Sequence, residues 1–213
     1  MSRKEAILLA ATQLFAKRGF SATPTSAIAK EAGVAEGLIF HYFRTKEGIL
    51  SNLLNEMTES YLSESRDRMD HCATGLDAIK ASIRFHFQFS RDNSEALAVL
   101  IRDFPFSVPR GGETLSKLTK DGADRVTHLW EECIDRGKKD GSIRGVPTRE
   151  TALLLWGMLT GVSRLQILGP IEVPDLTHHI IDFSVRALSG FTEKKGGKAA
   201  VLSFSANALL VFS

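Results

Sequence analysis

The residues that could do chemistry by themselves are the histidines and cysteines, and their spacing argues against catalysis. The chain has six histidines and two cysteines. His71 stands beside Cys72 and could supply two metal ligands, but we interpret the pair as an ordinary helix end. The sequence contains no His-Glu-x-x-His, Cys-x-x-Cys, phosphate-binding glycine loop or Gly-x-Ser-x-Gly pattern. We therefore expect no catalytic residue, no metal and no cofactor.

Residues 25–47 instead have the pattern of a recognition element. The apolar spacing over residues 25–32 predicts a short helix, with Thr25 or Ser26 able to cap its first free amides. Gly33 follows where a helix needs a left-handed residue at its C-terminal end. A second short helix is predicted over about residues 35–43. Two short helices joined by a glycine turn are typical of the helix-turn-helix, whose second helix enters the DNA major groove.

The surroundings of this element make the pattern more specific. An amphipathic helix precedes it and a His-Tyr-Phe-x-x-Lys-Glu-x-Ile-Leu pattern follows it. The positions that carry a recognisable pattern are Ala11, Leu14, Phe15, Gly19, Phe20, Thr25, Ile28, Ala29, Ala32, Gly33, Val34, Gly37, His41, Tyr42, Phe43, Lys46 and Leu50. With these residues at this spacing, the chain from Ile7 to Leu50 resembles the DNA-binding domain of the TetR family of bacterial repressors. The alternative is an ordinary helical hairpin with an aromatic core.

The resemblance implies a palindromic double-stranded DNA operator bound by a homodimer. The implied contact residues are Thr25, Ser26, Glu36, Gly37, Leu38, Phe40, His41, Tyr42 and Lys46. Hydroxyls and amides at the start of the first helix would contact phosphates, as would the polar side chains after the recognition helix. Leu38 and Phe40 could meet thymine methyl groups. Glu36 either accepts from a cytosine amino group or favours the helix N-terminus electrostatically.

Composition and charge fit a DNA-binding protein of the cytoplasm. The net charge of the 213 residues is only +2, but residues 1–47 hold seven Lys or Arg against four Glu. This local excess suits phosphate contact, and it equally fits an ordinary solvated surface, so charge alone does not separate the two. The two cysteines are far apart in sequence, which favours a reduced compartment. We see no secretory signal and no apolar run of the roughly 20 residues that span a bilayer.

The rest of the chain has helical periodicity throughout, which predicts an all-α fold. Thr45 can cap a long helix over residues 46–70 that leaves the DNA-binding part without a flexible linker. Further helices are predicted over residues 76–90, 94–104, 113–136, 148–168 and 175–188, with a loop at 104–112 and a turn at 137–147. We divide the chain into a three-helix DNA-binding domain (1–47), a larger helical ligand-binding and dimerisation domain (48–190) and a tail (191–213). The apolar end of the tail could be a packing helix, a docking segment or a disordered end.

The resemblance also implies an inducer pocket in the larger domain. Its aromatic residues at helical spacing favour a hydrophobic small molecule, which would release the protein from DNA. The candidate ligand-binding residues are Phe85, Phe89, Phe104, Trp130, Trp156 and Arg164. We thus expect a ligand-responsive, non-enzymatic regulator, most simply a repressor. The alternatives are a metal- or redox-responsive helical regulator and a non-catalytic interaction module.

Overall fold

The computed structural model describes residues 1–103 and 112–189, and every regular element in these ranges is a helix. The all-α prediction is therefore confirmed. Phe104, most of the predicted loop and the tail from residue 191 lie outside the described residues. The helices are α1 (Arg3–Arg18), α2 (Thr25–Glu31), α3 (Gly37–Phe43), α4 (Lys46–Asp70), α5 (Gly75–Asp92), α6 (Ser94–Asp103), α7 (Gly112–Asp140), α8 (Thr148–Leu168) and α9 (Thr177–Leu188).

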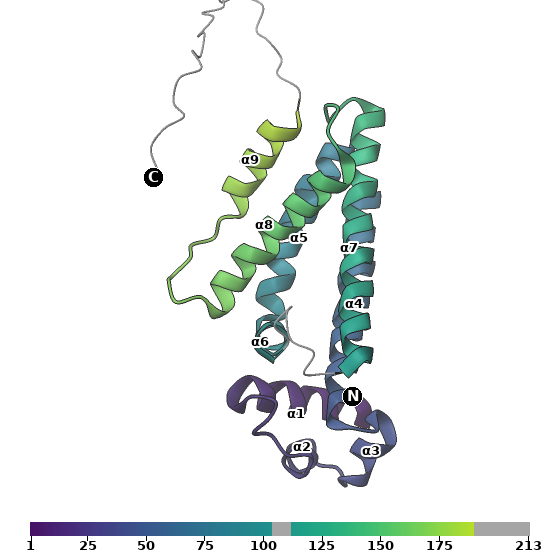
Figure 1. Ribbon diagram of the computed structural model, residues 1–213, viewed down its shortest axis with the longest axis vertical. Coiled ribbons are helices and arrows are strands. Elements are labelled where there is room, and N and C mark those ends of the chain that lie inside the picture. The colour runs from purple at the N-terminus through teal and green to yellow at the C-terminus, as the bar shows by residue number, and fades with distance from the viewer. Residues whose placement is uncertain (104–111, 190–213) are drawn as a thin grey trace, which may run out of the picture.

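The first three helices and the start of α4 form a small head at one end of the molecule (Figure 1). A capping box starts α1: the Ser2 hydroxyl accepts from the amide of Glu5, and the Glu5 carboxylate accepts from the amide of Ser2. Gly19, with a φ of 83°, ends it. The head has its own core of buried apolar side chains. Its members are Ile7, Leu8, Ala10, Ala11, Leu14, Phe15, Ile28, Ala29, Ile39, Phe43, Ile49, Leu50 and Val99.

The turn between α2 and α3 has the predicted glycine, but the helix starts differ from the predictions. Gly33 has a φ of 65°, which confirms the left-handed turn. The expected cap by Thr25 or Ser26 is wrong, because Pro24 occupies the N-cap position and no side chain caps α2. The second helix starts at Gly37, two residues later than predicted.

The long helix α4 belongs to two cores and so joins the head to the rest of the molecule. Thr45 caps it as predicted, accepting from the amide of Gly48 at 3.0 Å. Ile49 and Leu50 at its start belong to the head core, whereas Leu53 and the apolar residues after it belong to a larger body core. The body core is formed by α4, α5, α7, α8 and α9, with Ala96 from α6. No break in the helix separates the two cores.

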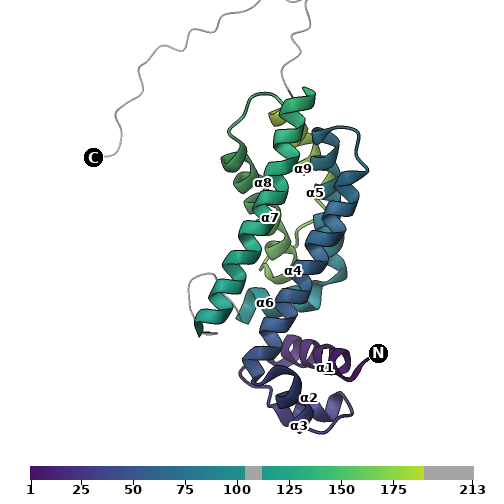
Figure 2. The same ribbon diagram turned by 90° about the vertical axis from the view of Figure 1, so that its right-hand side faces the viewer.

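Helix α7 runs beside α4 (Figures 1 and 2) and is longer than predicted. The predicted turn at Gly137 is wrong, because α7 continues to Asp140. The reason is tertiary: a Cβ on Gly75 would lie only 2.1 Å from the amide nitrogen of Gly137, so the start of α5 packs directly on the backbone of α7. The Asp140 carboxylate also accepts from the amide of Gly75 at 2.7 Å. The last turn of α7 is thus held by the N-terminus of α5.

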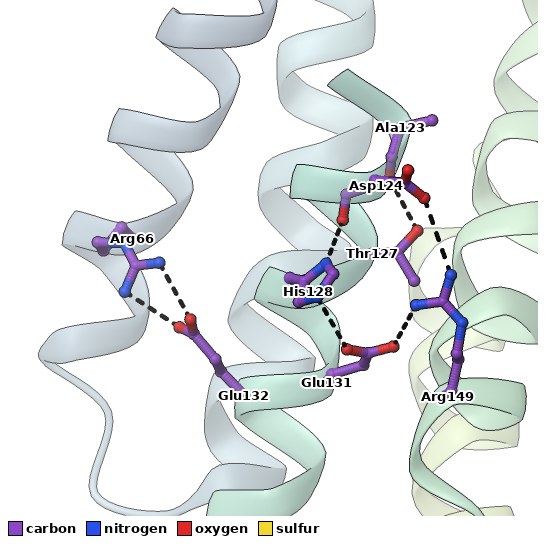
Figure 3. Close-up of polar contacts among 8 residues, drawn as sticks. All are labelled: Arg66, Ala123, Asp124, Thr127, His128, Glu131, Glu132 and Arg149. Carbon is purple, nitrogen blue, oxygen red and sulfur yellow. Dashed lines mark hydrogen bonds and ion pairs between the residues drawn. The ribbon is translucent and has the colours of Figure 1, made fainter. Parts of the chain in front are cut away.

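Ion pairs brace α7 on two sides (Figure 3). Arg66 of α4 lies 3.0 Å from Glu132 of α7. On the other side, Arg149 at the start of α8 lies 2.9 Å from Glu131 and 3.8 Å from Asp124. These pairs are exposed or partly exposed, so each contributes less than about 1 kcal/mol. They join α7 to α4 on one side and to α8 on the other.

Helices α8 and α9 lie on one side of the body, at the left in Figure 1, and leave an apolar face uncovered. The exposed residues of this kind are Leu153, Leu154, Leu165, Leu168 and Phe183. Leu154 is 74% exposed and Phe183 is 65% exposed. Against our prediction, α8 is long and apolar enough to cross a bilayer by length and composition alone, and 22% of its most apolar stretch is buried. Such a surface calls for a covering partner.

Candidate nucleic-acid interface and ligand cavity

The local packing of the head fixes which face of α3 points outward. The amide of Val34 donates to the carbonyl of Ala29 at 3.0 Å, which closes the turn after α2. Ile39 and Phe43 of α3 are buried in the head core against Ile28 of α2. The side chains between them are therefore left on the outer surface of the head.

The outer face of α3 carries aromatic rings and an open glycine. Phe40 is 47% exposed and Tyr42 is 39% exposed, and His41 is also exposed. The His41 and Tyr42 rings stand edge to face with centroids 5.0 Å apart. Gly37 is exposed, and a Cβ there would meet nothing within 4 Å. Leu38 is only partly buried and packs against the head core. This face can make apolar and stacking contacts, with few hydrogen-bonding groups.

The starts of α2 and α3 are tied to each other. The Thr25 hydroxyl donates to the Glu36 carboxylate at 2.6 Å. Ser26 is exposed beside it. The carboxylate of Glu36 therefore has a partner within the head, and its position at the start of α3 also suits the helix dipole.

Lys46 is engaged inside the head. Its ammonium donates to the carbonyl oxygens of Phe20 and Thr23, at 2.9 Å and 3.0 Å, and lies 4.4 Å from the centre of the Phe20 ring. Arg44, which we did not predict, is the exposed cation beside the recognition helix. It ends α3 with a φ of 65°, a conformation uncommon for a residue other than glycine. Residues 40–47 around Arg44 contain no glycine or asparagine that would have signalled this backbone conformation.

A cavity of about 370 Å³ lies in the body between five helices. Trp156 and Arg164, both predicted, line it. Phe85, Phe89 and Trp130 instead lie in the body core and are not among the described residues of the cavity wall. The described wall consists of Leu54, Thr58, His86, Ser90, Leu97, Leu100, Ile101, Thr119, Gly122, Ala123, Val126, Trp156, Gly157, Thr160, Gly161, Ser163, Arg164 and Ile167.

Three of the wall residues, His86, Ser90 and Ser163, are buried and polar, and Tyr61 of the body core lies against them. The Tyr61 hydroxyl lies 3.2 Å from His86 Nδ1, and His86 Nε2 lies 3.1 Å from the Ser163 hydroxyl. The Ser163 hydroxyl donates in turn to that of Ser90 at 3.1 Å. Burial lowers the pKa of His86 to about 4, so the ring is neutral at pH 7, and burial also raises the pKa of Tyr61. We call these four residues the buried relay.

The described residues offer little for metal or redox chemistry. Within residues 1–103 and 112–189, no group of three or more His, Cys, Asp or Glu side chains is placed to hold a metal ion. The His71 ring lies 2.6 Å from the carbonyl of Asp67, and the Cys72 thiol donates to the carbonyl of Arg68. Cys133 is buried, and burial raises the pKa of its thiol to about 12, which makes it a poor nucleophile at neutral pH.

Comparison with known proteins identifies the family. Residues 7–53 match the family model of bacterial regulatory proteins of the tetR family, and residues 72–188 match a tetracyclin repressor-like C-terminal domain. The chain is 30% identical over 146 residues to the transcriptional repressor KstR2 of Rhodococcus jostii, covering 67% of this chain and 68% of that protein.

Solved structures share the fold at lower identity. FadR from Bacillus subtilis in complex with stearoyl-CoA superposes with a TM-score of 0.74 at 20% identity, over 85% of this chain and 97% of that one. AibR in complex with isovaleryl coenzyme A and operator DNA gives a TM-score of 0.65 at 20% identity, over 88% and 98% of the two chains. The two family models cover most of the head and most of the body, with residues 54–71 of α4 between them. The chain belongs to the TetR family of bacterial regulatory proteins.

Proposed function

We propose that this protein is a ligand-responsive transcriptional repressor that binds a palindromic operator as a homodimer and is released by a hydrophobic small molecule. The head (1–47) would read DNA, and residues 48–190 would bind the ligand and the second copy. The outer face of α3, with Phe40, His41 and Tyr42, would lie in the major groove. Its scarcity of hydrogen-bonding groups favours thymine contacts and DNA shape as sources of specificity.

The observation that carries this proposal is that the cavity wall and the head core share helix α4. Leu54 and Thr58 line the cavity, and Leu50, one turn before Leu54, lies in the head core. One helical turn is about 5.4 Å, so a ligand touching Leu54 is about one turn from the head. Because helices are stiff, a shift of α4 at the cavity tilts the head with it.

Helix α6 gives a second connection. Leu97, Leu100 and Ile101 line the cavity, whereas Val99 between them is buried in the head core. The guanidinium of Arg102 donates to the carbonyl oxygens at the end of α1, with the shorter distance, 2.6 Å, to Phe15. A ligand that displaces α6 would therefore move α1 as well as α4.

The ligand class follows from the cavity and from the relatives. A volume of about 370 Å³ lies at the lower end of the 300–1,000 Å³ usual for ligand pockets. Most of its described wall is apolar, and Arg164 is the exposed cation at its edge. The FadR and AibR structures contain acyl-coenzyme A ligands. An apolar acyl or similar group that fills the cavity is the occupant we favour.

The dimer interface would be the uncovered apolar face of α8 and α9. We propose that a second copy of the chain covers this face. One side of α8 packs on α5, α6 and α7, and the apolar side chains that this packing leaves exposed include Leu154 and Leu165. Replacing Leu154, 74% exposed, by Glu should convert the dimer to a monomer in analytical ultracentrifugation. Leu9, 51% exposed on α1, offers the matched control: Leu9→Glu should remain dimeric.

DNA binding is tested by fluorescence anisotropy with duplexes from the region upstream of the coding sequence. We expect tight, sequence-selective binding by the wild type and a loss of at least tenfold in Tyr42→Ala. Leu9→Ala, which shortens an exposed apolar side chain of the head outside α3 and outside the proposed dimer interface, is the control. Binding that ignores sequence and is unchanged in Tyr42→Ala would reject the proposed reader.

A further inference from the structure

The proposed function leaves open what kind of hydrophobic molecule the cavity selects. Two threonine hydroxyls on its wall already donate to backbone carbonyls: Thr58 to that of Leu54 and Thr160 to that of Trp156, both at 2.8 Å. These hydroxyls offer lone pairs but no proton to a ligand. The buried relay is different, because its hydrogen bonds run from one side chain to the next.

The direction of the relay follows from the protonation of His86. A neutral imidazole has one N–H donor and one acceptor nitrogen. The Ser163 hydroxyl donates its single proton to Ser90, so its oxygen is the acceptor in the contact with His86 Nε2. We therefore assign the proton to Nε2. Nδ1 then accepts from the Tyr61 hydroxyl.

The same reasoning fixes the other end of the relay. The Ser163 oxygen accepts from Nε2, and its single proton is donated to the Ser90 oxygen at 3.1 Å. Ser90 is only 5% exposed and lines the cavity. Within the described part of the chain, the contact with Ser163 is the one hydrogen bond that the Ser90 hydroxyl makes, and Ser90 accepts in it, so its own proton has no assigned acceptor. A buried donor without an acceptor is unfavourable, so the proton is available to a ligand.

We propose that Ser90 presents a hydrogen-bond donor to the cavity and that the ligand is an apolar molecule with a neutral carbonyl-type acceptor, such as a ketone, ester or thioester. This inference rests on the proposed hydrophobic ligand and names its polar group. We assign a neutral acceptor because the relay carries no charge, and because Arg164, the cation among the described wall residues, is exposed to solvent and so pairs only weakly with a carboxylate buried in the cavity. Each donor in the relay polarises the next, which strengthens the last hydrogen bond.

Isothermal titration calorimetry with two matched probes tests this inference. Acetophenone has a carbonyl where ethylbenzene has a methylene, and the two are otherwise alike in shape. We expect the wild type to bind acetophenone about fivefold to tenfold more tightly, the value of one neutral hydrogen bond. Ser90→Ala should lose this preference and bind ethylbenzene at least as tightly as acetophenone, because the carbonyl would then be buried without a donor. Ser184→Ala, which removes an equally buried hydroxyl outside the cavity wall, should keep the wild-type preference.

A measurement on the wild type alone covers the case in which Ser90→Ala does not fold. The infrared carbonyl stretch of bound acetophenone should lie below its frequency in an alkane solvent. Equal affinity of the wild type for the two probes, an unshifted stretch, or a preference that persists in Ser90→Ala would overturn the role of Ser90 and leave the cavity as a ligand site. Binding of neither probe by the folded wild type would instead count against the proposed hydrophobic ligand.

Discussion

Replacing Lys46 by Met separates two roles that this lysine could have. The ammonium donates to the carbonyls of Phe20 and Thr23 and stacks on the Phe20 ring, which ties the start of α4 to the chain between α1 and α2. Met keeps much of the side-chain length and removes the charge. Hydrogen bonds that involve a charged group contribute about 1.5–3 kcal/mol each. Because Lys46 is only partly buried, water replaces part of the loss, and we expect about 2 kcal/mol of destabilisation.

Urea denaturation and the salt dependence of operator binding are the assays. If Lys46 is a structural tie, Lys46→Met lowers the urea midpoint while the slope of log affinity against log salt is unchanged. A phosphate contact would instead leave stability almost unchanged and reduce that slope by about 0.9. Lys30→Met, on the exposed side of α2, is the control and should change stability by less than about 0.5 kcal/mol. Wild-type stability in Lys46→Met would refute the structural role.

Three further predictions concern packing, pH and capping. Gly75→Ala should destabilise the protein by about 3 kcal/mol in urea denaturation, because its Cβ would collide with the backbone of α7, whereas Gly145→Ala, with open space around its Cβ, should be nearly neutral. The unfolded chain takes up a proton on His86 near pH 6.5, but the folded chain does so only near pH 4. The free energy of unfolding should therefore fall by up to about 3 kcal/mol as the pH drops through this window. His86→Gln should show a smaller fall, and a pH profile of stability identical to that of the wild type would contradict the buried neutral ring. Thr45→Ala should cost about 1 kcal/mol by removing the cap of α4, and Thr45→Ser should restore it, both measured by thermal unfolding.

Local signals in the sequence predicted the elements well where a short-range contact determines the structure. The Thr45 cap and the left-handed Gly33 involve neighbours in the chain, and both were confirmed. The end of α7 was wrong because it depends on Gly75, whose backbone packs on Gly137 from far away in the sequence. A helix end held by a distant helix leaves no local signal.

The candidate sites show the same limit. Phe85, Phe89 and Trp156 all sit at helical spacing, but only the packing of α5 and α8 decides that Trp156 meets the cavity while the two phenylalanines meet the core. The tie between Lys46 and the carbonyl of Phe20 spans 26 residues and follows no sequence pattern. The cap of α4 was readable from sequence because its partner is three residues away, whereas the expected cap of α2 was wrong because the Thr25 hydroxyl bonds to Glu36 at the start of α3. Residues whose partners come from other helices are not readable in this way.

The buried relay also bears on how a small ligand could control a much larger DNA complex. Allosteric coupling between two sites is typically about 1–3 kcal/mol. A ligand carbonyl that accepts from Ser90 contributes about 1 kcal/mol to the binding free energy. It does so only while α4, α5 and α8 are placed so that the three hydrogen bonds of the buried relay are intact. Each arrangement that shifts α4 relative to α8 lengthens a link in this chain. A carbonyl ligand would therefore bind more tightly to one position of α4 than to others, and α4 is the helix that carries the head. A hydrocarbon of the same shape would show a smaller difference in affinity between these positions.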